Sequence, residues 1–129
     1  MYTDIRGIDM YVHYNNNPCG INNGDCVIRA ISIVTGYSWK KVYAGLCIQG
    51  YKDCGFGNFN SVWADYLAYI GYKRYSIIGD ITVAEFAELH PNGSYILGTG
   101  THAVAVVNGD WVDSWDSGGE KPIYYFVKE

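Results

Sequence analysis

The fold is decided by a polar turn that runs into an apolar segment, Asn22-Asn23-Gly24-Asp25-Cys26-Val27-Ile28-Arg29-Ala30-Ile31-Ser32-Ile33-Val34-Thr35-Gly36. This pattern predicts a helix that begins at Cys26 and stops at Gly36. Its apolar residues lie on nearly every side, which is typical of a helix buried in the middle of its domain. A thiol at the helix start lies near free N–H groups and the positive end of the helix dipole, which favour thiolate. Cys26 is therefore a candidate nucleophile.

The remaining residues predict one domain that spans residues 1–129. Alternation over residues 10–14 indicates a short strand or an extended arm. The next expected elements are a helix over about 39–48 capped by Ser38, a glycine-rich loop over 50–58, a helix over about 61–70, a strand over 72–78, and a short helix from the Thr82–Glu85 capping box to near His90.

Four short strands are expected in the last third of the chain, over 95–97, 102–107, 111–115 and 123–127, with glycines between them. Because the helices precede these strands, the expected class is α+β. We expect N-terminal helices, with the helix from Cys26 at the centre, packed on a C-terminal antiparallel sheet of about four to five strands.

Charge and cysteine content narrow the classes of partner. The net charge is −4 and no basic run or stripe exists, so we expect neither nucleic acid nor an anionic membrane surface as a partner. The sequence has no signal-peptide pattern and no stretch approaching ~18 apolar residues, which predicts a cytoplasmic protein, in the host cytoplasm if a phage encodes it. In a chain without a signal peptide, cysteines are only weak evidence for disulfide bonds. The cysteines lack close zinc-site spacing, so no metal is expected, and three of them are interpreted as inert: Cys19, Cys47 and Cys54.

The Asn108–Gly109 dipeptide between two apolar runs is a strong hairpin signal. A two-residue turn there would pair Val107 with Asp110. Pairing inward from that point places Asp113 diagonal to His102 on one face of the sheet, within reach of the imidazole ring. The second half of the chain therefore predicts an imidazole beside a carboxylate.

A three-residue loop over 108–110 would instead place Asp116 opposite His102, because a one-residue slip moves every side chain to the other face. We favour Asp113. Each residue also has a purely structural interpretation. Cys26 could be a buried structural thiol and His102 a core histidine. Asp113 or Asp116 could be a turn residue whose side chain bonds its own backbone. Together they match a thiolate–imidazolium pair whose ring is oriented by a carboxylate.

Other side chains are candidates for supporting roles. Trp39, Tyr43, Phe56 and Phe59 are aromatic residues that could line a cleft. Arg29 is interpreted as a structural anchor for a neighbouring loop or carboxylate.

The order of these residues resembles that of the papain-like cysteine peptidase superfamily in its small forms. The likeness is carried by a Cys at a helix start, by His102-Ala-Val-Ala-Val-Val, by Asp113-Ser114-Trp115, and by Gly118-Gly119 followed by Ile123-Tyr124-Tyr125. These segments are similar to the superfamily's His-Ala-Val strand, its Asn-Ser-Trp motif and its closing strand. The resemblance implies that Asp113 replaces the orienting Asn and that Trp115 shields it from water.

Three further groups of proteins are similar to this chain. Residues 24–32 resemble the nucleophile helix of the ovarian-tumour deubiquitinases. The bacteriocin-processing peptidases are more loosely similar, and short phage and bacterial proteins of this build are similar as well. Many papain-like enzymes carry a Gln six positions before the nucleophile, where this chain has Gly20. Asn22 and Asn23, with backbone N–H groups of the helix start, are therefore the candidate oxyanion donors.

The residues and the resemblance together predict a cysteine-dependent amide-bond hydrolase, which is a peptidase, isopeptidase or amidase. It would use Cys26, His102 and Asp113 as a triad and form a thioester intermediate. No cofactor is expected, and the expected partner is a peptide or protein substrate. The alternative is a non-catalytic binding or inhibitory protein on the same fold, such as a phage protein that acts on a host factor.

Overall fold

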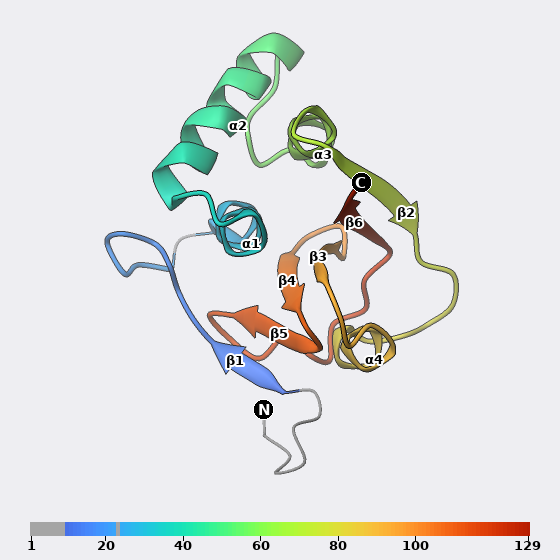
Figure 1. Ribbon diagram of the computed structural model, residues 1–129. Coiled ribbons are helices and arrows are strands. Elements are labelled where there is room, and N and C mark those ends of the chain that lie inside the picture. The colour runs from blue at the N-terminus through green and yellow to red at the C-terminus, as the bar shows by residue number, and fades with distance from the viewer. Residues whose placement is uncertain (1–9, 23) are drawn as a thin grey trace.

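The computed structural model describes residues 10–22 and 24–129 (Figure 1). The helices of these residues are α1 (Cys26–Thr35), α2 (Trp39–Asp53), α3 (Asn60–Tyr69) and α4 (Val83–Leu89). The strands are β1 (Tyr11–His13), β2 (Tyr72–Ser76), β3 (Ser94–Gly98), β4 (Ala103–Val107), β5 (Asp110–Asp113) and β6 (Tyr124–Lys128). The predicted α+β class is confirmed.

The strands form one mixed sheet in the order β1-β5-β4-β3-β6-β2. The prediction of an antiparallel sheet of four to five strands is therefore wrong, since the sheet has six strands and β1 runs parallel to β5. Both outer strands come from segments that the sequence predicts as extended. Local alternation shows that a segment is extended but does not show which neighbour its backbone groups pair with. The pairing of β1 and β2 with the sheet was therefore not predicted.

The hairpin of β4 and β5 has the predicted two-residue turn. Asn108 and Gly109 have φ values of 49° and 85°, and positive values at both positions are what a type I′ turn requires. Val107 pairs with Asp110 as predicted, so the alternative three-residue loop is wrong.

Helix α1 lies between the sheet and α2 (Figure 1). It begins at Cys26 and ends before Gly36, whose left-handed φ of 78° closes the helix, as predicted. Its buried apolar residues are Val27, Ala30 and Ile31, which join a core with Ile96, Ala103 and Phe126 of the sheet. Arg29 and Ser32 are also buried, so the helix carries polar groups into the interior as well.

Helix α2 continues to Asp53, so the predicted end near residue 48 is wrong. Gly50 remains inside the helix, and a Cβ there would lie 2.6 Å from the backbone oxygen of Gly55. This glycine therefore permits close approach of the following loop and does not stop the helix. Cys54, with a φ of 59°, ends the helix instead.

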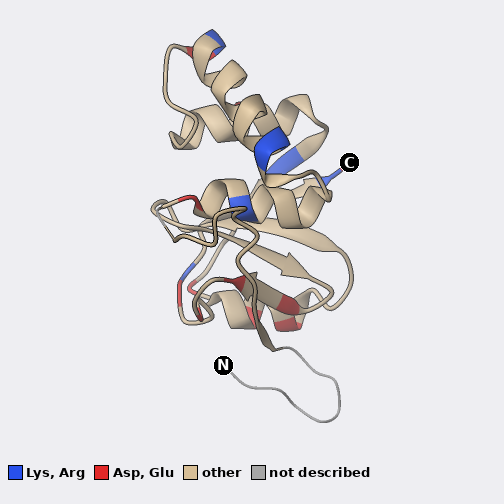
Figure 2. Cartoon of the chain, turned by 90° about the vertical axis from the view of Figure 1, so that its left-hand side faces the viewer, with Lys and Arg blue, Asp and Glu red and all other residues tan. Residues whose placement is uncertain are grey.

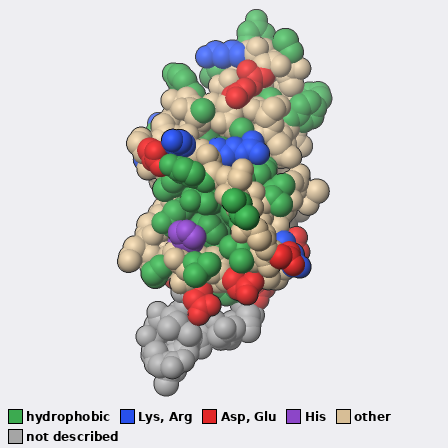
Figure 3. All heavy atoms as spheres, turned by 90° about the vertical axis from the view of Figure 1, so that its right-hand side faces the viewer, with side chains coloured by type: hydrophobic (Ala, Val, Ile, Leu, Met, Phe, Trp, Pro, Cys, Tyr) green, Lys and Arg blue, Asp and Glu red, His purple; other side chains and the backbone are tan. Residues whose placement is uncertain are grey.

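Helix α4 covers the face of the sheet opposite α1. The Thr82–Glu85 capping box forms at its start, as predicted. In the core, α4 packs against Leu97, Val104 and Val106. Along β3 and β4 these residues alternate with the residues that face α1. Next to it, ring contacts join Phe86, His90, Tyr95 and Tyr125. Figure 3, seen from the side of β2 and α4, shows hydrophobic side chains gathered around a histidine.

Figure 2 shows the positions of Lys and Arg mostly in the upper part of its view and most positions of Asp and Glu in the lower part. Within residues 10–22 and 24–129, every helix is too short or too polar to cross a bilayer.

The close contact between β3 and Tyr124 gives a stability prediction. A Cβ on Gly98 would lie 2.2 Å from a ring carbon of the buried Tyr124. Gly98→Ala should lower the free energy of unfolding in urea by about 1–3 kcal/mol, because an overpacked ring must leave its preferred rotamer. The control is Gly119→Ala, whose Cβ position has no heavy atom within 4 Å, and its expected change is within about 0.5 kcal/mol. Equal stabilities of the two variants would contradict this packing.

Candidate active site

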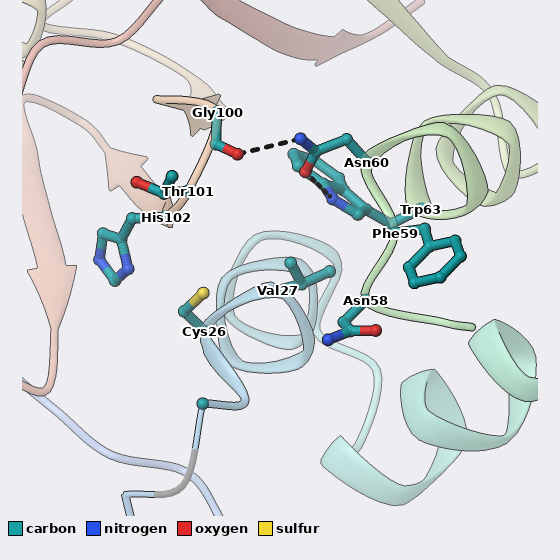
Figure 4. Close-up of a pocket in the computed structure, with 10 residues that line it drawn as sticks. Cys26, Val27, Asn58, Phe59, Asn60, Trp63, Gly100, Thr101 and His102 are labelled. Carbon is teal, nitrogen blue, oxygen red and sulfur yellow. Dashed lines mark hydrogen bonds between the residues drawn. The ribbon is translucent and has the colours of Figure 1, made fainter. Parts of the chain in front are cut away.

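A cavity of about 510 Å³ opens at the start of α1, and Cys26 and His102 both line it (Figure 4). Cys26 is the first residue of the helix, and Asp25 before it makes no capping hydrogen bond through its side chain. The thiol of Cys26 and the imidazole of His102 lie close enough at this wall of the cavity for each to shift the pKa of the other. The structure thus brings the predicted nucleophile and the predicted base together.

His102 precedes β4 on a tight loop that begins at Thr99. The Thr99 N–H donates to the His102 carbonyl at 2.9 Å, and the Thr99 hydroxyl accepts from the His102 N–H at 3.1 Å. Nδ2 of Asn60 donates to the Gly100 carbonyl at 3.0 Å, and Oδ1 of Asn60 accepts from the Trp63 indole at 3.0 Å (Figure 4). The loop that carries His102 is therefore tied to α3 across the cavity.

Asp113 ends β5 and is buried beside the imidazole. Its Oδ2 lies 2.6 Å from Nε2 of His102 and accepts a hydrogen bond from the Ser117 hydroxyl at 2.7 Å. Its Oδ1 accepts from the Ser114 N–H at 2.7 Å. Because Asp113 occupies Nε2, the other ring nitrogen, Nδ1, is the one left for the thiol.

Asp116, the alternative acid, has a different task. It accepts hydrogen bonds from Nε1 of Trp111 at 2.8 Å and from the Gly118 N–H at 3.0 Å, which fixes the turn after β5. The ring of Trp115 lies 4.9 Å from the ring of His102, between centroids, and remains 43% exposed. The predicted shielding residue therefore covers one side of the imidazole while its own outer side faces solvent.

The surroundings of the thiol favour its ionised form. Burial raises the pKa of Cys26, but the nearby His102 side chain and the Ala103 N–H lower it, as does the positive charge of Arg29. The net effect places the pKa of Cys26 below its ordinary value. A thiolate is the reactive form of cysteine, so the site is suited to nucleophilic attack.

The surroundings of the imidazole favour its charged form. Burial lowers the pKa of His102, but the hydrogen bond and negative charge of Asp113, together with the nearby Cys26, raise it to about 9. Burial raises the pKa of Asp113, whereas hydrogen bonds from His102, Ser117 and the Ser114 N–H bring it below its ordinary value. The electrostatics therefore favour an imidazolium that lies between a carboxylate and a thiol of lowered pKa.

A buried ion pair of Asp25 and Arg29 lies behind the site, and the sequence predicts a role for only one of the two residues. Oδ1 of Asp25 accepts a hydrogen bond from Nη1 of Arg29, and Oδ2 accepts from Asn17 and from the Trp39 indole, both at 2.9 Å. Nη2 of Arg29 lies 3.6 Å from Oδ1 of Asp113. The predicted anchoring role of Arg29 agrees with these contacts, but Asp25 had no predicted role. Opposite charges four residues apart on a helix are the sequence signal for this pair.

The candidate oxyanion donors precede the helix. Oδ1 of Asn22 accepts hydrogen bonds from Arg29 and from the Ser114 hydroxyl, both at 3.4 Å. These contacts hold the carbonyl end of the Asn22 amide and leave its nitrogen end for another group. Asn23 lies outside the described residues.

The four aromatic residues proposed for a cleft lie at different places. Phe59 lines the main cavity, whereas Tyr43 and Phe56 line an adjoining cavity of about 260 Å³. Trp39 bonds Asp25 and lines a separate hollow. The two adjoining cavities share Gly24, Val27 and Asn58. A bound chain could therefore pass from the thiol toward an aromatic side pocket.

Comparison of the chain with protein-family models, with curated proteins and with solved structures finds no match. The chemistry of the site therefore carries the functional conclusion.

The acid beside His102 can be identified by titration. Since the pKa of His102 rises from its ordinary 6.5 to about 9 on folding, the imidazolium stabilises the fold fully below pH 6.5, and this stabilisation is lost as the pH rises toward 9. Asp113→Asn should lower the NMR titration midpoint of His102 by at least about 1 unit, because it removes the nearest negative charge.

Asp116→Asn is the matched control for that titration. It removes an equal charge from the same turn, and its expected shift of the His102 midpoint is within about 0.3 units. Equal shifts in the two variants would show that the Asp113 contact does not set the state of the ring.

Proposed function

We propose that this chain is a cysteine-dependent amide-bond hydrolase, acting as a peptidase, isopeptidase or amidase on a peptide or protein substrate. The observation that carries the proposal is the grouping of three side chains at the wall of a cavity: the Cys26 thiol, the His102 imidazole beside it, and the Asp113 carboxylate 2.6 Å from that imidazole. A nucleophile, a base and an orienting acid within hydrogen-bond reach are the arrangement that covalent acyl transfer needs.

In the first half of the reaction, the Cys26 thiolate attacks the carbonyl carbon of the scissile amide. A C–S bond forms, and the carbonyl electron pair moves to oxygen as an oxyanion. When the oxyanion collapses, the C–N bond breaks, and the leaving nitrogen takes the proton that His102 holds. The products of this half are a free amine and a thioester on Cys26.

In the second half, His102 accepts a proton from water, and the resulting hydroxide attacks the thioester carbon. The second oxyanion collapses, the C–S bond breaks and the thiolate leaves, while the acid product forms. His102 again carries the proton, so the thiolate–imidazolium pair is restored. Asp113 keeps the ring oriented and stabilises its charge throughout. Another acceptor in place of water would make the same residues an acyltransferase.

The oxyanion would be stabilised by N–H groups at the start of α1 and by the amide nitrogen of Asn22 or of Asn23. The first N–H groups of a helix lack partners within the helix, and the side chain of Asp25 does not cap them. The positive end of the helix dipole adds to their effect. Developing negative charge on oxygen therefore has donors beside the thiol.

The papain-like assignment is part of the same proposal. What supports it is the order of the site along the chain: a thiol at the start of a central helix, an imidazole before a strand, and an acid on the next strand. The Trp115 ring against His102 supports it as well. The mixed six-stranded sheet and the absence of a Gln six positions before Cys26 are departures from the family pattern.

The test is the site-resolved rate of labelling at pH 7 by a peptide vinyl sulfone, read by mass spectrometry. The other three cysteines serve as internal references because they are exposed free thiols: Cys19, Cys47 and Cys54. Cys26 should be labelled faster than each of them by about 100-fold, although it is the least exposed. His102→Ala should lower the Cys26 rate by about 10²-fold or more.

His90→Ala is the control, since His90 stacks on Phe86 beside α4, on the other face of the sheet. Its Cys26 rate should stay within about twofold of wild type. Turnover is read separately, as cleavage products from a pooled peptide mixture that Cys26→Ala does not form. Labelling of Cys26 no faster than of the exposed cysteines would overturn the proposal and favour the non-catalytic binding protein.

A further inference from the structure

Arg29 and Cys26 share one face of α1, because side chains three residues apart are neighbours on a helix. The helix packs against β4 and β5. His102 precedes the first of these strands and Asp113 ends the second. Arg29 is only 4% exposed. Its positive charge is therefore buried directly behind the thiol, the imidazole and the carboxylate.

The contacts of Arg29 balance two buried carboxylates. Nη1 pairs with Asp25, and Nη2 lies 3.6 Å from Oδ1 of Asp113. Oδ2 of Asp113 faces the imidazole of His102 at 2.6 Å. Arg29 and the imidazolium together thus match the two carboxylates, and each charge has a partner, as buried charges require.

The groups around Arg29 come from the segments that pack on α1. They are Asp113 from β5 and, from the preceding loop, Asp25 and Asn22. Two further groups contact these carboxylates: His102 before β4 contacts Asp113, and the Trp39 indole of α2 contacts Asp25. Among these described neighbours, Asp25 is next to the thiol in the chain. Without Arg29, its carboxylate would repel the Cys26 thiolate.

We propose that Arg29 is a positioning residue of the active site: it holds the Asp113 carboxylate under His102 and neutralises the Asp25 carboxylate next to Cys26. The inference rests on the proposed function, since it concerns how the thiolate of that site is maintained. It separates two roles within one ion pair. Asp25 anchors the Trp39 indole and the Asn17 amide, and Arg29 prevents that anchor from opposing the nucleophile.

The proposal predicts opposite effects of the two halves of the pair. Arg29→Met leaves Asp25 and Asp113 with one cation between them, so the thiolate becomes less favourable. Asp25→Asn leaves Arg29 facing Asp113 and the thiolate, so the thiolate becomes more favourable. A merely structural ion pair would instead weaken the fold in both variants and leave the ionisation of Cys26 unchanged.

The measurement is the pH profile of Cys26 alkylation by iodoacetamide, followed by mass spectrometry on the full chain. The midpoint should rise by about 1 unit in Arg29→Met and fall by about 0.5 unit in Asp25→Asn. The double variant should lie between the two single variants. Arg29→Gln, a second neutral variant with a polar side chain, should also raise the midpoint and replaces Arg29→Met if that variant does not fold.

Trp39→Phe is the matched control, because it removes a partner of Asp25 without changing any charge. It should lower the melting temperature and leave the midpoint within about 0.2 unit of wild type. Folded Arg29 and Asp25 variants that keep the wild-type midpoint, or shift it in the same direction, overturn the proposal. If neither Arg29 variant folds, Asp25→Asn decides alone: a lower midpoint supports the proposal, and an unchanged or higher one overturns it.

Failure of the proposed function has a different signature. In that case wild-type Cys26 itself would titrate as an ordinary thiol, and His102→Ala would leave its profile unchanged. Failure of the Arg29 proposal alone leaves a low wild-type midpoint that depends on His102 but does not respond to the charges of Arg29 and Asp25.

Discussion

The register of β4 against β5 is the constraint on which the rest of the site depends. The two-residue turn at Asn108–Gly109 sets it, and the 2.6 Å contact between His102 and Asp113 follows from it. A slip of one residue would turn the acid to the other face of the sheet. The same slip would exchange Ala105, which faces α1, with Val106, which faces α4. Because both faces are buried, the hydrophobic core enforces the pairing that the chemistry needs.

Helix α1 serves the core and the site at once, and this creates an electrostatic problem. Ile31 is completely buried in the same helix that carries the charged Arg29 inward. A buried charge is tolerated only when partners match it, and Asp25 and Asp113 supply them. The side chain of Asp25 is thereby committed to anchoring and does not cap the helix. The uncapped helix start is what leaves N–H groups beside Cys26.

Features that depend on local chemistry could be predicted from the sequence. The bounds of α1 follow from Cys26 and Gly36, and the hairpin follows from Asn108–Gly109, because turn and cap residues act over a few positions. The pairing of His102 with Asp113 followed from the hairpin by geometry. The triad geometry was thus within reach of sequence reasoning, whereas its catalytic use stays a prediction.

Features that depend on contacts between distant segments could not be predicted in the same way. The continuation of α2 past Gly50 reflects the approach of Gly55, and the parallel pairing of β1 reflects the position of β5. The 3.6 Å approach of Arg29 to Asp113 joins residues that no local pattern connects.

Strand β1 shows why such contacts between distant segments matter for the site. The Tyr14 N–H and the Tyr11 hydroxyl donate to the Asp113 carbonyl at 2.9 Å and 3.2 Å. The acid is therefore held through its main chain by the N-terminal segment of β1 and through its side chain by the turn after β5. The segment that the sequence predicts as a strand or an extended arm is thus part of what orients the base.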